Sequence, residues 1–480
     1  MKLLSGDEIA VLREQTLSLV TEVGLKVDHE VVQQLLLAAG CTLAPDGRVR
    51  FPASLVADFV ALQQARQAEE QTAVPLQTSQ AAPAACLRPS GLMGCAFGPG
   101  PTRYYDYASG QTLPVSTPLA ADMMRFASAT PEIARVAPWF RQDIPHGASA
   151  VDDLVFALKL TRKTVGLDAL NPAEVKYLAE ISEIVTGRSG DSSYVSGSQC
   201  MTPPLTLGRR AAQEMLERRK YNVPRFYVAT MAMVGASTPV DLLSATALAA
   251  AEALAGLCAA YVIYPEAALG GTAATTVLDM ASGNAAMNAP ESALLDAGVK
   301  ELFDAAFGGH VTAHVRYAPT AKVPGLQAVA ENYFGALACS RLLDTPPNYA
   351  GNGNLDMGGV GSPVQAMLDI EILKSLDWLD AGPGRCSERM SLEELSKIVR
   401  AGGNFLASEH TLRNYRSVWS PGLLLRQQPG AEWDGTERSL LDRCNAQWQD
   451  NLCRYEPPDW EEGVVRALEG VLERAQAELG

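Results

Sequence analysis

The sequence predicts an α/β protein that folds as a (β/α)8 TIM barrel with helical extensions at both ends. Eight short runs rich in β-branched and aromatic residues alternate with helix-length apolar or alanine-rich segments. Strands that alternate with helices indicate parallel pairing through helical crossovers. Eight such units match a (β/α)8 barrel. A doubly wound sheet is the alternative, but no glycine-rich nucleotide-binding turn follows the first strand candidate.

The chain order predicts three regions. Residues 1–90 form an N-terminal helical extension and a linker, because apolar residues recur at helical spacing and a Gln-, Ala- and Pro-rich stretch follows. Residues 91–384 form the barrel, and residues 385–480 a C-terminal helical extension. The expected strands are 92–98, 136–144, 164–167, 193–199, 225–233, 260–264, 310–317 and 348–351. The main intervening helices are expected at 154–162, 173–185, 211–220, 239–257 and 329–342.

Composition narrows the classes of function. The chain has 480 residues and a net charge of −15, with no basic patch to bind the phosphates of a nucleic acid. The longest apolar stretch, 242–264, contains Glu252 and predicts a buried helix running into a strand, not a membrane span. Nine scattered cysteines without a C-x-x-C pair favour a reducing cytoplasm. We therefore expect a cytoplasmic enzyme, and a homo-oligomer.

Chemistry in a barrel lies at the carboxyl ends of the strands, which selects the candidate site residues. Two of them, His314 and Glu266, could act as catalytic groups. The others are aromatic, amide or cationic side chains suited to binding a small substrate. The predicted substrate-binding residues are Phe97, Gln199, Tyr227, Tyr264, Arg316, Tyr317, Asn352 and Asn354.

Two of the five histidines, His310 and His314, are four residues apart in the stretch HVTAHVRYAP. On a helix they could chelate one metal ion. Gly308 and Gly309 before them, and the β-branched residues between them, predict a strand instead. Strand positions four apart are separated by roughly 13 Å, too far to share an ion. We therefore expect no metal site here.

The standard catalytic motifs are not found in the sequence. It contains no P-loop, no G-x-S-x-G nucleophile elbow and no H-E-x-x-H zinc motif. The glycine-rich stretch GNGNLDMGGVGS, residues 351–362, could let the backbone approach a ligand closely, cradle a phosphate, or simply form turns. These observations leave the reaction open.

Several blocks along the chain resemble one known family. They are EVGLKVDHEVVQQLLLAAGCTLAPDGRVRFPASLV (22–56), TRYYDYASGQTLPVSTPLAADMMRFASATPEI (102–133), MAMVGASTPVDLL (231–243), LDMASGNAAMNAPE (278–291), AKVPGLQAVAEN (321–332) and GNFLASEHTLRNYRSVWSPGLL (403–424). Together they resemble the trimethylamine methyltransferase family, and more closely its members without pyrrolysine, typified by glycine betaine:corrinoid methyltransferases. The resemblance covers nearly the whole chain and implies a TIM barrel.

The resemblance also implies a reaction, namely methyl transfer from a methylated amine to the Co(I) of cobalamin carried by a partner corrinoid protein. Pyrrolysine is thought to activate trimethylamine in the family, and this chain contains only the twenty standard residues. No Cys/His cluster is spaced for zinc. A quaternary ammonium needs neither device, because it is already charged and leaves as a neutral amine. Aromatic faces would hold such a cation, and Arg316 or an amide could hold the carboxylate of a betaine.

The sequence departs from the family pattern at two positions. Gly325 stands where members often have an acidic residue, and Ala281 where they often have an arginine. Substrate identity therefore stays open, and a family member with another methyl donor is an alternative. Two further hypotheses are a methylated-amine binding protein without turnover, and a barrel lyase or hydrolase that uses Glu266 or His314 as a general base.

Overall fold

Parallel strands in chain order form the centre of the protein. The computed structural model describes residues 2–72, 95–98, 100–144, 149–314, 318–343, 353–380, 382–384, 386, 388–426 and 435–479. Strand β4 (Cys95–Phe97) pairs in parallel with β7 (Ile133–Val136), and single parallel bridges then join Val136 to Thr164 and Leu167 to Val195. The next strands, β8 (Gln199–Cys200), β10 (Arg225–Thr230), β12 (Ala268–Ala273) and β15 (His310–Ala313), form one four-stranded parallel sheet in the order β15-β12-β10-β8.

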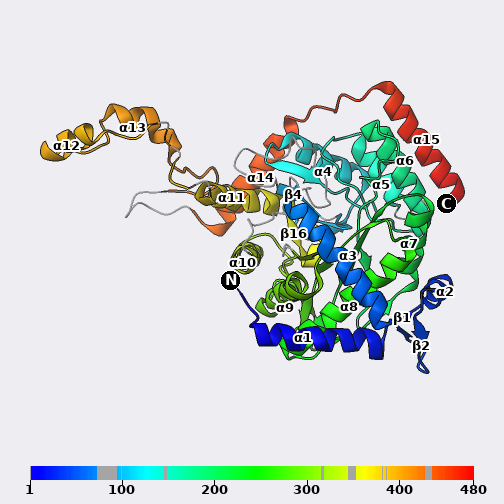
Figure 1. Ribbon diagram of the computed structural model, residues 1–480. Helices are drawn as coiled ribbons and strands as arrows, with labels where there is room; N and C mark the ends of the chain where they lie inside the picture. The colour runs from blue at the N-terminus through cyan, green and yellow to red at the C-terminus, as the bar shows by residue number, and fades with distance from the viewer. Residues whose placement is uncertain are drawn as a thin grey trace.

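Helices connect these strands and cover the sheet (Figure 1). They are α4 (Thr117–Ala129), α5 (Ala150–Leu158), α6 (Val175–Thr186), α7 (Arg209–Lys220), α8 (Leu242–Ile263), α9 (Pro290–Leu302) and α10 (Leu326–Leu343). The alternation confirms a mixed α/β fold with helical crossovers. The expected eighth strand, 348–351, lies outside the described residues.

The sixth strand is a correction to the sequence prediction. Residues 260–264 were expected to be a strand, but α8 continues through Ile263 and the strand β12 begins at Ala268. Gly270 and Gly271 weaken the strand signal of β12 in the sequence, because glycine is rare in strand interiors. The sheet needs one of them, since a Cβ on Gly271 would lie 2.7 Å from the carbonyl oxygen of Val228. A second correction concerns 136–144: β7 ends at Val136, and Pro138 follows in a segment that is not a strand.

The N-terminal helices share a hydrophobic core with the sheet. They are α1 (Gly6–Ser18), α2 (Glu30–Ala38) and α3 (Ala53–Thr72), and they pack against α8. Helix α8 is the only helix among the described residues that is long and apolar enough to cross a membrane, and most of its 22 residues are buried inside the protein. It is therefore the central helix of the hydrophobic core that the N-terminal helices share with the sheet.

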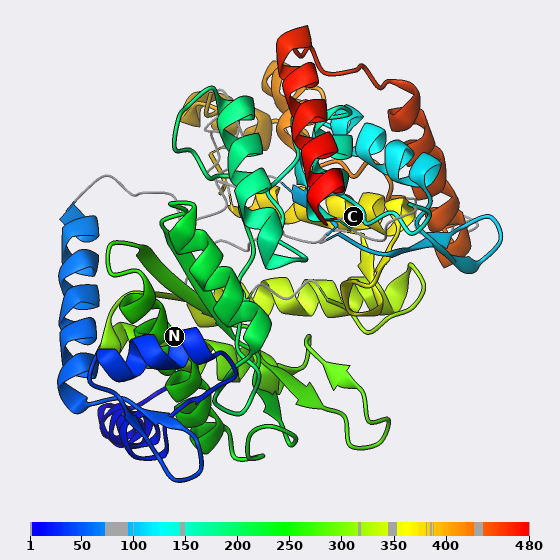
Figure 2. The same ribbon diagram turned by 90° about the vertical axis from the view of Figure 1, so that its right-hand side faces the viewer.

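The C-terminal helices pack on helices that lie away from the N-terminal extension. Helix α14 (Glu437–Cys453) contacts α4 and α11 (Pro363–Asp380), and α15 (Glu462–Leu479) contacts α5 and α6. Figure 2 shows them, towards red, on the opposite side of the molecule from the blue N-terminal helices. Two further helices, α12 (Leu392–Arg400) and α13 (Glu409–Asn414), project away from the rest of the protein in Figure 1.

Short strands complete the described structure. They pair as β1 (Lys26–Val27) with β9 (Thr206–Leu207), β2 (Thr42–Leu43) with β3 (Val49–Arg50), β5 (Arg103–Asp106) with β6 (Gln111–Pro114) and β17 (Val360–Gly361), β17 with β16 (Asn354–Leu355), and β13 (Thr276–Leu278) with β11 (Met233–Val234) and β14 (Ala285–Ala286).

Candidate functional site

The four-stranded sheet has two faces of different chemistry. Val228 of β10 faces the helices, because a Cβ added to Gly256 of α8 would lie 2.7 Å from its side chain. Its register partners Gln199 and Gly271 share this side, which we call the helix face. Neighbouring residues in a strand point to opposite sides. Tyr227, Thr272 and Thr312 therefore lie on the other side, which we call the site face.

Uncharged hydroxyl groups are joined on the site face. Ala229, Thr272 and Thr312 share one register across three strands, and Tyr227 is two residues before Ala229 in β10. The Tyr227 hydroxyl is hydrogen-bonded to Oγ1 of Thr312, and Oγ1 of Thr272 donates to the Thr312 carbonyl oxygen at 3.0 Å. Burial raises the pKa of Tyr227, so the phenol stays protonated and neutral. The face thus offers a fixed aromatic ring and hydroxyls near the carboxyl ends of the strands.

Buried carboxylates stand on the helix face and hold the same strand ends. Gln199 donates to Oε1 of Glu214 on α7 at 2.8 Å, and Thr230 donates to Oε1 of Glu252 on α8 at 2.8 Å. Glu252 also accepts the Leu205 amide at 2.9 Å. Burial raises the pKa of Glu252. The buried carboxylates of Glu214 and Glu252 therefore hold the strand ends in place from the helix face.

The next strand end is held in the same way by α9. Oδ1 of Asp296 accepts the Thr275 amide at 2.9 Å and the Thr275 hydroxyl at 2.6 Å. Its other oxygen accepts the His314 amide at 3.2 Å, and that amide also donates to the Ala273 carbonyl oxygen at 2.8 Å. One buried carboxylate thus fixes the segments that follow β12 and β15.

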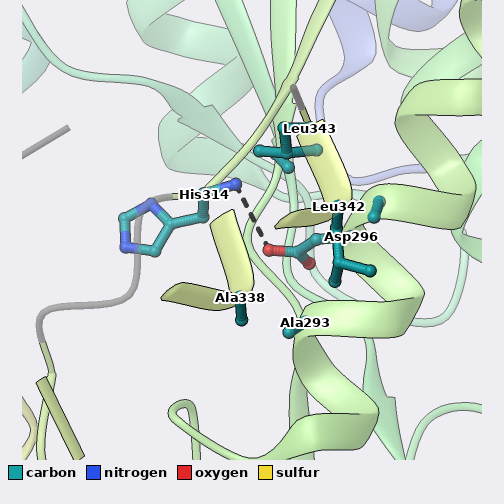
Figure 3. Close-up of a pocket in the computed structure, with 8 residues that line it drawn as sticks. Ala293, Asp296, His314, Ala338, Leu342 and Leu343 are labelled. Atoms are coloured by element: carbon teal, nitrogen blue, oxygen red, sulfur yellow. Dashed lines mark hydrogen bonds between the residues drawn. The ribbon is translucent and has the colours of Figure 1, made fainter. Parts of the chain in front are cut away.

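His314, a predicted catalytic residue, lies where β15 ends. A small pocket between α9, α10 and this strand end is lined by Ala293, Asp296, Ala297, Ala313, His314, Ala338, Leu342 and Leu343. Figure 3 shows the imidazole extending away from Asp296 while the backbone amide is bonded to it. By strand alternation the ring projects on the side of Thr312, which is the site face. Tyr227 and His314 are therefore on one face of the sheet.

Three predicted residues have core or scaffold positions. Phe97 is fully buried, with its ring centroid 5.4 Å from those of both Phe126 and Trp139. Asn354 is buried in β16, opposite Gly361. Gln199 is the helix-face residue bonded to Glu214. Their contacts favour packing and positioning. The predicted binding residues Arg316, Tyr317 and Asn352 lie outside the described residues.

Tyr264 and Glu266 are corrections. Both were expected at the carboxyl end of a strand at 260–264, but they lie between α8 and the beginning of β12. Tyr264 packs edge-on against Phe226, near the start of β10, with centroids 6.1 Å apart, and Glu266 is exposed. A six-residue strand is about 20 Å long. The two residues therefore lie at the far end of the sheet from His314 and cannot share a site with it.

Sequence reasoning missed the hydroxyl partners of Tyr227 and the carboxylate of Asp168. Thr312 stands two residues before His314, so the strand phase alone would have placed it beside a predicted site residue. Asp168 directly follows Leu167 of the third strand segment, so its position at a strand end was the available signal. Burial and the neighbouring Glu214 raise the pKa of Asp168 to about 6, and Arg210 lies 3.4 Å from it. Among the described residues, no group of three His, Cys, Asp or Glu side chains could hold a metal ion.

The fold and site together define an α/β protein with a preorganised face of aromatic and hydroxyl groups toward the carboxyl ends of parallel strands, as in enzymes that act on small molecules. Comparison with known sequences identifies its family. The trimethylamine methyltransferase (MTTB) family is matched over residues 1–480, and the chain belongs to it.

Individual relatives are more distant. The chain is 29% identical over 279 residues to trimethylamine methyltransferase MttB2 of Methanosarcina mazei, covering 58% of this chain and 54% of that protein. It is 25% identical over 349 residues to the glycine betaine methyltransferase of Desulfitobacterium hafniense, covering 71% and 70%. The chain thus spans about half the length of the first of these relatives. The monomethylamine methyltransferase MtmB of Methanosarcina barkeri superimposes with a TM-score of 0.46 at 11% identity, over 98% of this chain and 92% of that one.

Proposed function

We propose that the protein transfers a methyl group from a quaternary amine, such as a betaine, to the Co(I) of a corrinoid carried by a separate protein. Family membership supports methyl transfer. The observation that carries the choice of donor is the site face, where the aromatic ring of Tyr227 is held by the neutral hydroxyl of Thr312 and lies beside Thr272. A cation that brings its own charge needs an aromatic surface more than a charged partner.

The proposed reaction needs no general acid or general base. The C–N bond breaks with its electron pair remaining on nitrogen, the Co(I) of the acceptor supplies the pair for the new C–Co bond, and a neutral tertiary amine leaves. No proton moves. The residues of this chain therefore bind the donor, exclude water and orient the methyl group in line with the acceptor. His314 and Arg316 are proposed to contact the donor's tail.

Access for the acceptor follows from the proposed barrel. We infer that the parallel series closes into a (β/α)8 barrel, with the regions before 91 and after 384 as extensions. The corrinoid protein would then dock over the carboxyl ends of the strands, where His314 follows β15. Cobalamin is a co-substrate in this scheme, carried by the partner.

The first experiment is methylation of free cob(I)alamin by the purified protein with a panel of quaternary amines, followed by the visible spectrum. We expect one compound to be turned over. A flat trace with every quaternary amine, or turnover of trimethylamine alone, would overturn the proposed donor. Tyr227→Leu should raise KM for the active compound on the order of tenfold, because one cation–π contact is lost. Tyr221→Leu, remote from the site face, is the matched control.

A further inference from the structure

Three buried polar side chains beyond the ends of β10 and β12 have no hydrogen-bond partner among the described residues. They are Thr238 and Thr276, each 7% exposed, and Asn288, which is 9% exposed. Both threonine hydroxyls and both polar atoms of the Asn288 amide are unpaired. We call these three residues the rim cluster. A buried polar group without a partner destabilises a protein, so we expect the partner to be a ligand.

Thr276 and Thr238 lie together past the carboxyl end of the sheet. The pairing of β10 with β12 continues into β11 and β13, because the Thr276 amide donates to the Ala232 carbonyl oxygen at 2.9 Å. By alternation Thr276 is on the site face, four residues and roughly 13 Å beyond Thr272. It stands opposite Met233, whose carbonyl oxygen accepts the Thr238 amide at 3.0 Å. The two threonines therefore flank one residue of β11.

Asn288 stands on the other side of β13, in the turn between β14 and α9. The Ser292 hydroxyl donates to the Ala286 carbonyl oxygen at 3.1 Å and closes this turn. The Ser292 carbonyl oxygen accepts the Thr275 hydroxyl at 3.3 Å. The turn is thus fixed to the segment just before β13, next to the carboxylate of Asp296 that also holds the end of β15.

The unpaired atoms indicate a ligand that both donates and accepts hydrogen bonds. An asparagine side chain has N–H donors and a carbonyl acceptor, and a threonine hydroxyl can act as either. A carboxylate would pair with the donors only and leave Oδ1 of Asn288 without a partner. An ammonium group would pair with the acceptors only. A primary amide pairs with both polar atoms of Asn288 at once.

Distance separates this ligand from the proposed methyl donor. Tyr227 is in register with Gly270, six residues before Thr276. Six strand residues span roughly 20 Å, which is longer than a small quaternary amine. A donor held by the Tyr227 ring therefore does not reach the rim cluster, whereas an acceptor that docks over the strand ends does.

We propose that the rim cluster binds amide side chains at the edge of the acceptor's corrin ring. The inference rests on the proposed function and names the residues that hold the acceptor. A corrin ring of the cobalamin type carries primary amides around its edge. Its cobalt, at the centre, must face the methyl group on the site face, so the edge of the ring lies against the loops that follow the strands. The rim cluster belongs to those loops.

Equilibrium dialysis of the full chain against cobinamide, which keeps the ring amides of cobalamin, tests this without methyl transfer. Asn288→Leu, similar in shape but unable to hydrogen-bond, should weaken binding on the order of tenfold, and Thr276→Val about threefold. Cobyrinic acid has carboxylates in place of the amides, so its affinity should change less in Asn288→Leu. Thr130→Val is the control, because Thr130 is buried, remote and fully paired, and it should bind cobinamide like wild type.

Thermal unfolding of the unliganded chain separates a binding role from a structural one. Thr276→Val and Asn288→Leu should leave the unfolding midpoint unchanged or raise it, because each removes unpaired buried polar atoms. Thr130→Val should lower the midpoint, because its hydroxyl donates to the Phe126 carbonyl oxygen at 2.8 Å and accepts from Asn451 at 3.1 Å. Circular dichroism checks that every variant is folded.

Three results would each overturn the inference: no binding of cobinamide by wild type, unchanged affinity in both rim variants, or a lower unfolding midpoint in both. Failure of the proposed function gives a different pattern. Cobinamide would bind wild type and lose affinity in the rim variants, while no quaternary amine would methylate cob(I)alamin. The rim cluster would then remain a corrinoid site, and the proposed donor alone would be wrong.

Discussion

The two faces of the parallel sheet use polar groups in opposite ways. On the helix face, Gln199, Thr230 and the nearby Thr275 are each held by a buried carboxylate from a helix. On the site face, Tyr227, Thr272 and Thr312 hold one another through neutral groups. A buried carboxylate that lost its partners would be expensive, whereas a neutral hydroxyl in a half-buried face is not. The difference indicates that the helix face fixes the strand ends and leaves the site face free for a ligand.

The largest expected effect is the loss of a helix-face carboxylate. Glu214 and Arg218 are both buried, 2.8 Å apart, and Glu214 also holds Gln199. Glu214→Ala should lower the free energy of unfolding by about 3–5 kcal/mol, because the Arg218 charge loses its buried partner. Urea unfolding followed by circular dichroism measures it.

The control for this prediction lies on the same helix. Glu217 pairs at 3.4 Å with Lys220, whose side chain is 61% exposed. Glu217→Ala should therefore change the free energy of unfolding by less than about 1 kcal/mol. Equal effects of the two substitutions would contradict the assigned role of the helix face.

The next effect is a pH dependence caused by Asp369 of α11. This fully buried carboxyl accepts the Gly353 amide at 2.9 Å and Gln365 Nε2 at 2.7 Å, and burial raises its pKa from 3.8 to about 6. Because the pKa is higher in the folded state, the folded protein binds more protons between about pH 4 and 6, and its stability falls as the pH rises through this window. From pH 7 to pH 4, wild type should gain about 2 kcal/mol relative to Asp369→Asn.

An exposed carboxylate serves as the comparison. The pKa of Asp241 is lowered by its hydrogen bonds to Ser244 at the start of α8. Wild type should therefore lose stability relative to Asp241→Asn as the pH falls through the acid range. Unfolding curves of the three proteins at several pH values measure both slopes. Slopes of the same sign would show that folding does not raise the pKa of Asp369.

The sequence predicted the α/β alternation and failed at β12, the strand of the sheet that contains two glycines. Helical and strand periodicities are local, so α7 and β10 were predicted within a few residues of their ends. Gly270 and Gly271 lower the strand signal of β12, yet the close approach of Val228 requires a residue without a side chain. The strand was therefore predicted at 260–264, before its actual position at Ala268–Ala273, and Glu266 was placed at the wrong end of the sheet.

For the candidate site, the sequence indicates only which residues of a strand point to the same face of the sheet. Strand alternation puts Tyr227 on the site face, where its role stays a prediction, whereas Gln199 points to the helices because its register partner is Val228. The carboxylates that hold the strand ends are 15 to 22 residues away in sequence, as for Gln199 with Glu214 and Thr230 with Glu252. Such pairs have no local signature, so they become visible only when the helices are packed.

The smallest expected effect is on the site face itself. Tyr227→Phe removes the hydroxyl bonded to Thr312 and keeps the ring, so the free energy of unfolding should fall by about 0.5–1.5 kcal/mol. The proposed cation–π contact needs the ring and not the hydroxyl, so KM for the active donor should change less than in Tyr227→Leu. Steady-state kinetics with cob(I)alamin as acceptor compares the two variants. If both raise KM equally, the hydroxyl itself contacts the donor, and the site face binds by hydrogen bonding and not through the aromatic ring.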